Sequence, residues 1–302
     1  MKSKFRLSEQ QRGILNGYAF ILPALIFMIA LIGYPTIYNF IISFQDATAQ
    51  AIASNSHQFI GFDNYRSIFS DSLLKQSFIN TFLYTIGCLA FQFSIGFILA
   101  LFFCKKFPLC KIIRGLVVIS WMLPVTVTAL IFKFMFSEGN GIINQILMNM
   151  HFIQQPVSWL TNGGTAMWSL IIANSWIGIP FNMLLLTTGL NNIPVDVMEA
   201  ASIDGANGIQ KFFRITIPLL KPTMMSVLVL GFVYTFKVFD LVFVMTSGGP
   251  VDSTQVLSTY SYKLSFSYFR FGEGAAAANI LFLCLFVVAL IYLKLVSDDE
   301  VM

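Results

Sequence analysis

The stretch GILNGYAFILPALIFMIALIGYPTIYNFIISFQ, residues 13–45, contains no charged residue. A helix needs about 20 consecutive apolar residues to cross the hydrocarbon core of a bilayer, so this stretch is long enough to span a membrane. Basic residues precede it, as in a signal peptide, and Ala-Thr-Ala at residues 47–49 resembles a cleavage site. Because the apolar stretch is about twice as long as the apolar part of a signal peptide, we predict an uncleaved membrane anchor.

The rest of the chain has the same character. Hydrophobic residues make up 57% of the sequence, charged residues make up 11%, and the mean hydropathy is +0.77. Soluble domains carry about 25% charged residues, and the long apolar blocks seen here exclude an ordinary soluble protein. We predict an all-α integral membrane protein of about six transmembrane helices, with residues 1–12 as a cytoplasmic segment and 13–302 as one membrane domain. The further spans are placed by length and hydropathy at residues 78–103, 113–136, 168–190, 223–246 and 275–295.

The distribution of basic residues predicts the orientation of the chain. With the N-terminus in the cytoplasm, most of the 18 Lys and Arg residues fall on the cytoplasmic side. The positive-inside rule then predicts that both termini are cytoplasmic, and the net charge of +4 reflects membrane topology rather than nucleic-acid binding. The cytoplasmic cations are Lys2, Lys4, Arg6, Arg12, Lys105, Lys106, Lys111, Arg114, Lys211, Arg214, Lys221 and Lys294, and the external ones are Arg66, Lys75, Lys263 and Arg270.

The cysteines and histidines show no spacing typical of a metal or catalytic site. The sequence contains no CxxC, HExxH or GxSxG motif. The cysteines fall in or beside apolar segments, where a thiol behaves as a small apolar side chain. We therefore predict no disulfide, no metal site and no catalytic residue for Cys88, Cys104, Cys110, Cys284, His57 and His151.

A polar segment at about residues 191–222 separates the fourth and fifth predicted spans. Asn192 before Pro194 is typical of a helix start, and Gly205 can adopt the left-handed conformation that ends one short helix before another begins. Pro218 and Pro222 are expected to limit how far the second helix continues.

The first of these short helices carries apolar side chains that have few partners. Val197, Met198 and Ala201 lie on it, and Phe212 follows nearby. Such a helix can dock in a groove of another protein, or it can lie on the membrane surface. Composition alone favours neither arrangement.

The order of residues in this segment resembles a known family. Glu199-Ala200-Ala201 and Asp204-Gly205-Ala206, followed by Phe213, Ile215, Pro218 and Pro222, match the EAA loop of binding-protein-dependent ABC importer permeases. The resemblance implies a type I importer permease architecture whose coupling helix docks in a cleft of a separate ATP-binding subunit. It also implies that Glu199 pairs with a basic residue there. The coupling residues expected on this basis are Glu199, Ala200, Ala201, Asp204, Gly205, Ala206 and Phe213.

The sequence contains no GxxxxGK[ST] phosphate-binding loop. We therefore expect a transport subunit that is not an enzyme and binds no cofactor, with ATP and Mg²⁺ bound by partner subunits. The resemblance implies a second homologous permease subunit, two ATP-binding subunits and an extracytoplasmic solute-binding protein. It also implies a location in the bacterial cytoplasmic (inner) membrane.

Other segments resemble the carbohydrate-uptake group of this family, and most of all the larger membrane subunit of maltose transporters. The likeness is carried by Phe239-Asp240, Thr246-Ser247-Gly248-Gly249-Pro250, Ser253-Thr254 and Tyr260-Ser261-Tyr262, and toward the N-terminus by Phe59-Ile60-Gly61-Phe62-Asp63-Asn64-Tyr65 and Leu22-Pro23-Ala24. The resemblance implies that an oligosaccharide is transported.

Two helix faces are candidates for the solute pathway. Asn174, Gly178 and Phe181 share one face of the fourth span. Amides can bond sugar hydroxyls and rings can stack on sugar C–H groups, although small and polar residues also mediate helix packing. In the related maltose subunit, positions matching several of these residues contact the sugar. The predicted lining is Asn174, Ile177, Gly178 and Phe181 from the fourth span, and Gly231, Tyr234, Thr235 and Val238 from the fifth.

Three charged residues fall inside predicted spans. A charge in a bilayer costs at least about 2.5 kcal/mol, so Lys133, Lys237 and Asp240 need partners or water. They could attract an anionic sugar, but we favour a structural explanation in which Lys237 and Asp240 neutralise each other and Lys133 extends to the interface. Asp240 is the best argument for an alternative, an ion-coupled secondary transporter, although the inverted repeats typical of that class are not evident. A non-transporting membrane scaffold is a third possibility.

Overall fold

The computed structural model describes residues 9–54, 56, 58–105 and 107–300, with side chains described from residue 17 to residue 294 except at the gaps. His57 and the basic residues Lys2, Lys4, Arg6 and Lys106 lie outside these ranges. The described residues form helices and turns, with two isolated bridges that pair Gln45 with Phe59 and Thr48 with Arg270.

Within the described residues, five helical segments are long and apolar enough to cross a membrane, or up to six if one bent pair counts as a span. Three of them are single helices: α5 (Ser72–Phe103), α9 (Gly163–Asn191) and α15 (Phe271–Glu300). The other two contain a π-helical turn, and their parts are α1 (Glu9–Met28), η1 (Ile29–Gly33) and α2 (Tyr34–Ile42), and α11 (Gly208–Lys211), η2 (Phe212–Thr216) and α12 (Ile217–Phe236). The predicted all-α membrane fold is confirmed.

The predicted third span is bent. Residues 113–136 were expected to form one helix, but α6 (Cys110–Met122) and α7 (Val125–Met135) meet at an angle of 96°. Leu123 and Pro124 are extended, with ψ angles of 139° and 134°. Proline disfavours the helical conformation of the residue before it and donates no backbone hydrogen bond, so Pro124 explains the bend.

The predicted fifth span, residues 223–246, is also wrong at its end. Helix α12 stops at Phe236, and α13 (Asp240–Met245) begins after a short turn. Lys237 forms no ion pair with Asp240 among the described residues, which contradicts the expected neutralisation; its ammonium instead lies 5.4 Å from the centre of the Tyr234 ring. Lys133 Nζ donates to the carbonyl of Val244 at 2.8 Å, so a backbone group accepts from this charge.

Pro218 does not limit the second helix as expected, because a π-helical turn precedes it. The N–H of Ile217 bonds to the carbonyl of Phe212, five residues back, and the extra residue in this turn leaves room for the ring of Pro218. Pro35 follows η1 in the same way, after the Tyr34 N–H bonds to the Ile29 carbonyl. The helix from Gly208 to Phe236 is therefore continuous past both Pro218 and Pro222.

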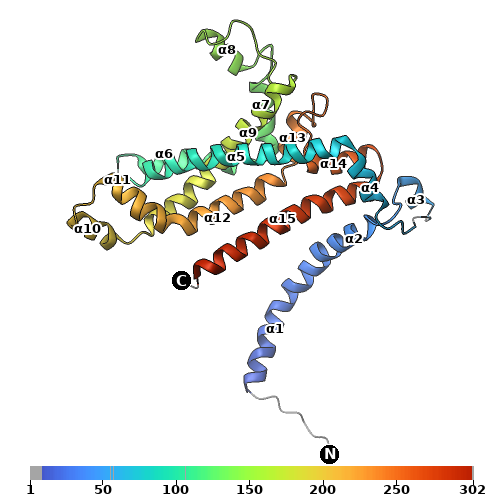
Figure 1. Ribbon diagram of the computed structural model, residues 1–302, viewed down its shortest axis with the longest axis horizontal. Helices are drawn as coiled ribbons and strands as arrows, with labels where there is room; N and C mark the ends of the chain where they lie inside the picture. Colours follow the sequence, from blue (N-terminus) through green and yellow to red (C-terminus); the bar gives the residue numbers. More distant parts are fainter. Residues whose placement is uncertain (1–8, 55, 57, 106, 301–302) are drawn as a thin grey trace, which may run out of the picture.

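The helices form an elongated bundle in which α5, α9, α12 and α15 run side by side, while α1 diverges from it (Figure 1). Helices α5 and α9 approach closely, since a Cβ on Gly96 would lie 2.7 Å from Cβ of Asn182. Helix α2 is tied to α15 by a 2.8 Å hydrogen bond from Asn39 Nδ2 to Asn279 Oδ1. The shorter helices are α3 (Ala49–Ala53), α4 (Asp63–Ser70), α8 (Ile142–Asn149), α10 (Val195–Ile203) and α14 (Leu257–Tyr262), and η3 (Lys263–Ser267) is a third π-helical turn.

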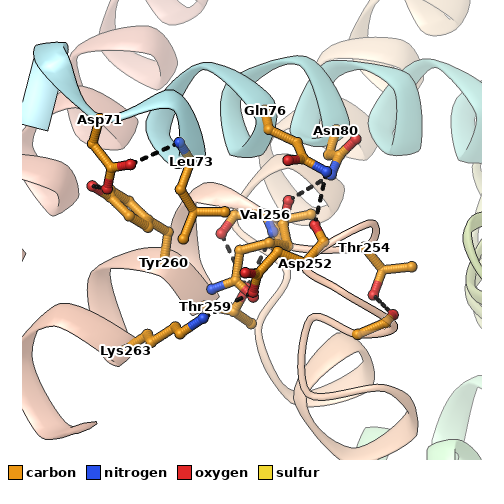
Figure 2. A network of polar contacts seen from close by, with 12 residues as sticks. Asp71, Leu73, Gln76, Asn80, Asp252, Thr254, Val256, Thr259, Tyr260 and Lys263 are labelled. Atoms are coloured by element: carbon orange, nitrogen blue, oxygen red, sulfur yellow. Dashed lines mark hydrogen bonds and ion pairs between the residues drawn. The ribbon is translucent and has the colours of Figure 1, made fainter. Parts of the chain in front are cut away.

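The connection between α13 and α14 is fastened to the first half of α5 by side-chain hydrogen bonds (Figure 2). Asn80 Nδ2 donates to the carbonyls of Ser253 at 3.0 Å and Gln255 at 2.9 Å. The hydroxyl of Tyr260 donates to Asp71 Oδ2 at 2.7 Å, and the other oxygen of this carboxylate caps α5. These bonds give this irregular connection a fixed place against the bundle.

Candidate functional site

A cleft of about 330 Å³ lies where α5, α6, α7, α9 and α12 meet. All the predicted pathway residues except Val238 line it. The two helix faces predicted from the fourth and fifth spans therefore line the same cleft. The complete lining is Gln92, Trp121, Val125, Asn174, Ile177, Gly178, Phe181, Asn182, Gly231, Tyr234 and Thr235.

One wall of the cleft is aromatic. The rings of Trp121 and Phe181 have their centroids 5.7 Å apart, and the Phe181 and Tyr234 rings meet edge to face at 6.1 Å. The Tyr234 side chain is 60% exposed, so its ring is open to a partner. A row of rings from three helices offers apolar faces on which a ligand with C–H groups can stack.

Another part of the cleft lining is polar and closely packed. Gln92 is only 3% exposed, and its Nε2 donates to the Asn174 carbonyl at 3.1 Å. Asn182 Nδ2 donates to the Gly178 carbonyl at 2.9 Å, while its buried Oδ1 has no hydrogen-bond partner among the described residues. A Cβ at Gly178 would lie 2.2 Å from Cδ of Gln92, so the Gln92 amide would have to move if this residue carried a side chain.

Val238 does not belong to this site. It follows the end of α12, packs against a buried cluster that includes Tyr84 and Leu241, and its carbonyl accepts a hydrogen bond from the Ser258 hydroxyl. Its assignment to the cleft lining assumed that the fifth span continues as a helix to residue 246. Because α12 ends at Phe236, the helical spacing from Gly231 fails at this residue.

Four lining residues were missed by the sequence prediction: Gln92, Trp121, Val125 and Asn182. Gln92 carried a signal, because an amide in the middle of an apolar span is expensive and often functional. Asn182 lies one residue after Phe181 and shares its helix with the predicted face. Trp121 and Val125 reach the cleft because the chain bends between them, which the hydropathy pattern does not indicate.

The second candidate site is the helical hairpin formed by α10 and α11. Pro194 precedes α10, whereas Asn192 caps the end of α9, so the predicted helix start at Asn192 is wrong by two residues. Gly205 has φ of +79°, and the Ala206 N–H bonds to the Ala201 carbonyl at 2.9 Å, an arrangement that ends helices. The expected glycine-terminated turn between two short helices is present.

This hairpin lies at one end of the bundle (Figure 1). The hairpin and the η2 turn that follows it expose large apolar side chains. The exposed fractions are 67% for Val195, 87% for Ile203 and 65% for Phe213. Glu199 is also exposed and forms no ion pair within the described part of the chain. Of the predicted coupling residues, Ala201 is buried in the fold and Ala206 is half-buried, while Glu199, Ala200, Asp204, Gly205 and Phe213 are open to a partner.

A bundle of membrane-length helices with a polar and aromatic cleft, and an exposed hairpin at one end, defines the membrane subunit of a transporter. Residues 92–299 match the model of the family described as "Binding-protein-dependent transport system inner membrane component". The chain belongs to this family, as its sequence predicted.

Curated relatives extend over nearly the whole chain. The "Trehalose/maltose transport system permease protein MalF" of Thermococcus litoralis is 32% identical over 282 residues, covering 92% of each chain. The "Sulfoquinovosyl glycerol transport system permease protein SmoG" of Agrobacterium fabrum is 31% identical over 243 residues, covering 80% of this chain and 78% of that one. These relatives are transport permeases, which favours a transport subunit over an enzyme, a scaffold or an ion-coupled transporter.

The fold agrees with a solved structure. A chain in the crystal structure of a bacterial ABC transporter involved in import of the acidic polysaccharide alginate superposes with a TM-score of 0.81 at 22% identity, over 94% of this chain and 96% of that one. At this level of identity the likeness concerns the fold alone. It confirms the architecture of a type I ABC importer permease.

Proposed function

We propose that this chain forms half of the pathway through which an ATP-driven importer moves an uncharged sugar. The observation that carries the proposal is the cleft, which combines aromatic rings from three helices with the amides of Gln92, Asn174 and Asn182. Sugars present hydroxyls that bond to amides and C–H faces that stack on rings. Relatives named for trehalose, maltose and sulfoquinovosyl glycerol transport support a carbohydrate.

The proposal of an uncharged ligand rests on the composition of the lining. No acidic or basic side chain lines the cleft within the described part of the chain. Lys133, Lys237 and Asp240, which could have attracted an anionic sugar, all lie outside the lining. A buried charge on the ligand would therefore have no counter-ion among the lining residues.

A second homologous permease subunit would complete the pathway, and two ATP-binding subunits, which hold ATP and Mg²⁺, would drive it. An extracytoplasmic solute-binding protein would deliver the sugar. This assembly is supported by family membership and by a neighbouring structure of an alginate transporter in complex with an "alginate pentasaccharide-bound periplasmic protein". In it the chain would cross a bacterial cytoplasmic membrane with both termini and the α10–α11 hairpin in the cytoplasm.

The ATP-binding subunit would act on the α10–α11 hairpin. Glu199 and the exposed apolar side chains of this hairpin would dock in a groove of that subunit. One continuous helix runs from Gly208, at the hairpin, to Gly231 and Thr235 in the cleft. Movement of the hairpin would therefore be transmitted along a stiff helix to the cleft wall, which couples nucleotide binding to a switch between inward- and outward-facing states.

Two substitutions test the proposal in proteoliposomes that contain the complete transporter. Asn174→Leu should lower sugar uptake without preventing assembly, whereas Thr188→Leu, on the same helix outside the cleft, should leave uptake unchanged. Glu199→Ala should reduce sugar-stimulated ATP hydrolysis, whereas Asp196→Ala, an exposed acid on the same helix, should have a much smaller effect. Normal uptake with Asn174→Leu would remove it from the lining, and normal coupling with Glu199→Ala would contradict the assigned docking contact.

A further inference from the structure

A second cleft, of about 690 Å³, lies where α5 turns into α6, next to the end of α9. The turn between α5 and α6 lies at the same end of the bundle as α10 (Figure 1), and this cleft shares no lining residue with the solute cleft. None of its residues belongs to the predicted solute pathway or to the predicted docking hairpin. Its lining is Phe103, Cys104, Lys105, Phe107, Leu109, Cys110, Lys111, Ile112, Arg114 and Asn191.

Of the residues that the structure describes, three cations and no acidic residue line this cleft. Lys105, Lys111 and Arg114 form no ion pair or hydrogen bond with any residue that the structure describes. Arg114 is partly buried, which makes the lack of a counter-ion costly for its guanidinium. An anion in the cleft would be attracted by all three charges at once.

The wall of the cleft continues as an exposed apolar strip along α6. Ile112 lines the cleft and is 60% exposed, and Leu116 and Ile119 follow on the same helix face with exposed fractions of 62% and 51%. The site therefore joins a cationic mouth to an apolar surface that runs toward the middle of a membrane-length segment. A free anion uses only the first of these two features, whereas a phospholipid uses both.

We propose that this cleft binds an anionic phospholipid, with its phosphate among Lys105, Lys111 and Arg114 and an acyl chain along Ile112 and Leu116. Basic pockets between helices at the membrane surface bind anionic lipid headgroups in this way. The lipid would bridge the α5–α6 turn and the end of α9, just before α10 begins. The proposal requires only that the chain is a membrane protein and does not depend on the identity of the transported solute.

The test is lipid binding to the purified full-length chain, measured by native mass spectrometry with phosphatidylglycerol and phosphatidylcholine as probes. Each surface cation contributes about 1 kcal/mol to binding of anionic lipid, so Arg114→Gln should weaken phosphatidylglycerol binding about fivefold. The triple variant Lys105→Gln, Lys111→Gln, Arg114→Gln should weaken it roughly a hundredfold. The matched control Arg66→Gln, Lys75→Gln, Lys294→Gln removes the same charge elsewhere and should bind like the wild type.

Further measurements on the unaltered protein identify the ligand without relying on a variant that could misfold. Added salt should weaken binding of phosphatidylglycerol to the unaltered protein, while binding of phosphatidylcholine should hardly change. Inorganic phosphate and soluble glycerophosphoglycerol should fail to displace the lipid at equal concentration. Equal binding of both lipids, displacement by inorganic phosphate, or wild-type binding by the folded triple variant would each overturn the proposal.

Discussion

Replacing Gly178 with alanine tests the geometry of the solute cleft most sharply. A Cβ at this position would lie 2.2 Å from Cδ of Gln92 and 2.5 Å from its Nε2 and Oε1. Carbon atoms in contact are normally separated by about 3.5–4.0 Å, so the amide of Gln92 must move by more than about 1 Å. Gln92 is 3% exposed, and the space available to its displaced amide is the cleft itself.

The energetic cost of Gly178→Ala follows from two effects. Moving the amide breaks the 3.1 Å hydrogen bond from Gln92 to the Asn174 carbonyl, worth about 0.5–1.5 kcal/mol. Repacking an overfilled interior costs a further 1–3 kcal/mol or so. Alanine favours the helix over glycine by about 1 kcal/mol, which offsets part of this cost. We therefore expect a net loss of about 0.5–3 kcal/mol in stability, together with a fall in sugar uptake, because the displaced side chain fills the cleft.

The assay is thermal unfolding in detergent, followed by tryptophan fluorescence, with uptake measured in parallel. Gly115→Ala is the matched control, since its Cβ would meet nothing within 4 Å and alanine favours a helix. Adding Gln92→Ala to Gly178→Ala removes the colliding amide and should restore much of the lost stability, as a double-mutant cycle can show. Wild-type stability and uptake in Gly178→Ala alone would refute this description of the cleft.

Three further predictions concern other parts of the fold. Gly205→Ala should lower the free energy of unfolding by about 1–2 kcal/mol, because φ is +79° at this residue, and should speed amide hydrogen exchange in the hairpin. Gly208→Ala should have neither effect. Gly96→Ala should lower the unfolding temperature, since its Cβ would lie 3.2 Å from two backbone atoms of α9, and an unchanged temperature would contradict the close α5–α9 packing. Tyr260→Phe should cost about 1 kcal/mol at neutral pH. Burial and the hydrogen bond to Asp71 raise the pKa of the Tyr260 hydroxyl in the folded protein. The hydroxyl of the unfolded chain ionises near pH 10 or so, so the stability difference between the two proteins should persist to about pH 10 and shrink above it. A difference that stays constant above that pH would contradict the assigned hydrogen bond.

Membrane-length helices were predictable because the apolar blocks are long and nearly free of charge. Four of the predicted spans correspond to helices that extend beyond the apolar core at one or both ends, as with α5, which begins at Ser72 instead of residue 78. Asp71 explains this early start, because its carboxylate caps the helix in a segment too polar for a hydropathy window to include. Local capping therefore decided boundaries that hydropathy left open.

Breaks within spans were harder to predict from sequence. Pro124 bends the third span by 96°, whereas Pro218 lies in a continuous helix. The difference is the π-helical turn before Pro218, which depends on backbone hydrogen bonding that composition does not encode. The end of α12 at Phe236 was equally difficult to predict. The charges of Lys237 and Asp240 did indicate that the predicted span was too long, because charged residues are rare inside membrane helices.

The cleft was predictable along each helix but not between helices. Helical spacing placed Asn174, Gly178 and Phe181 on one face, and all three line the cleft. The residues that pack against this face, Gln92 and Trp121, come from other helices, whose rotation is set by packing. Spacing within one helix carries no information about that rotation.

The central claim is that ATP hydrolysis by partner subunits drives sugar through this chain. Its most direct test is uptake of labelled sugar by proteoliposomes that contain the complete transporter, with ATP enclosed and with proton and sodium gradients abolished by ionophores. The account predicts uptake that requires both ATP and the solute-binding protein and is unaffected by the ionophores. Uptake that proceeds without nucleotide and stops when an ion gradient is abolished would contradict it.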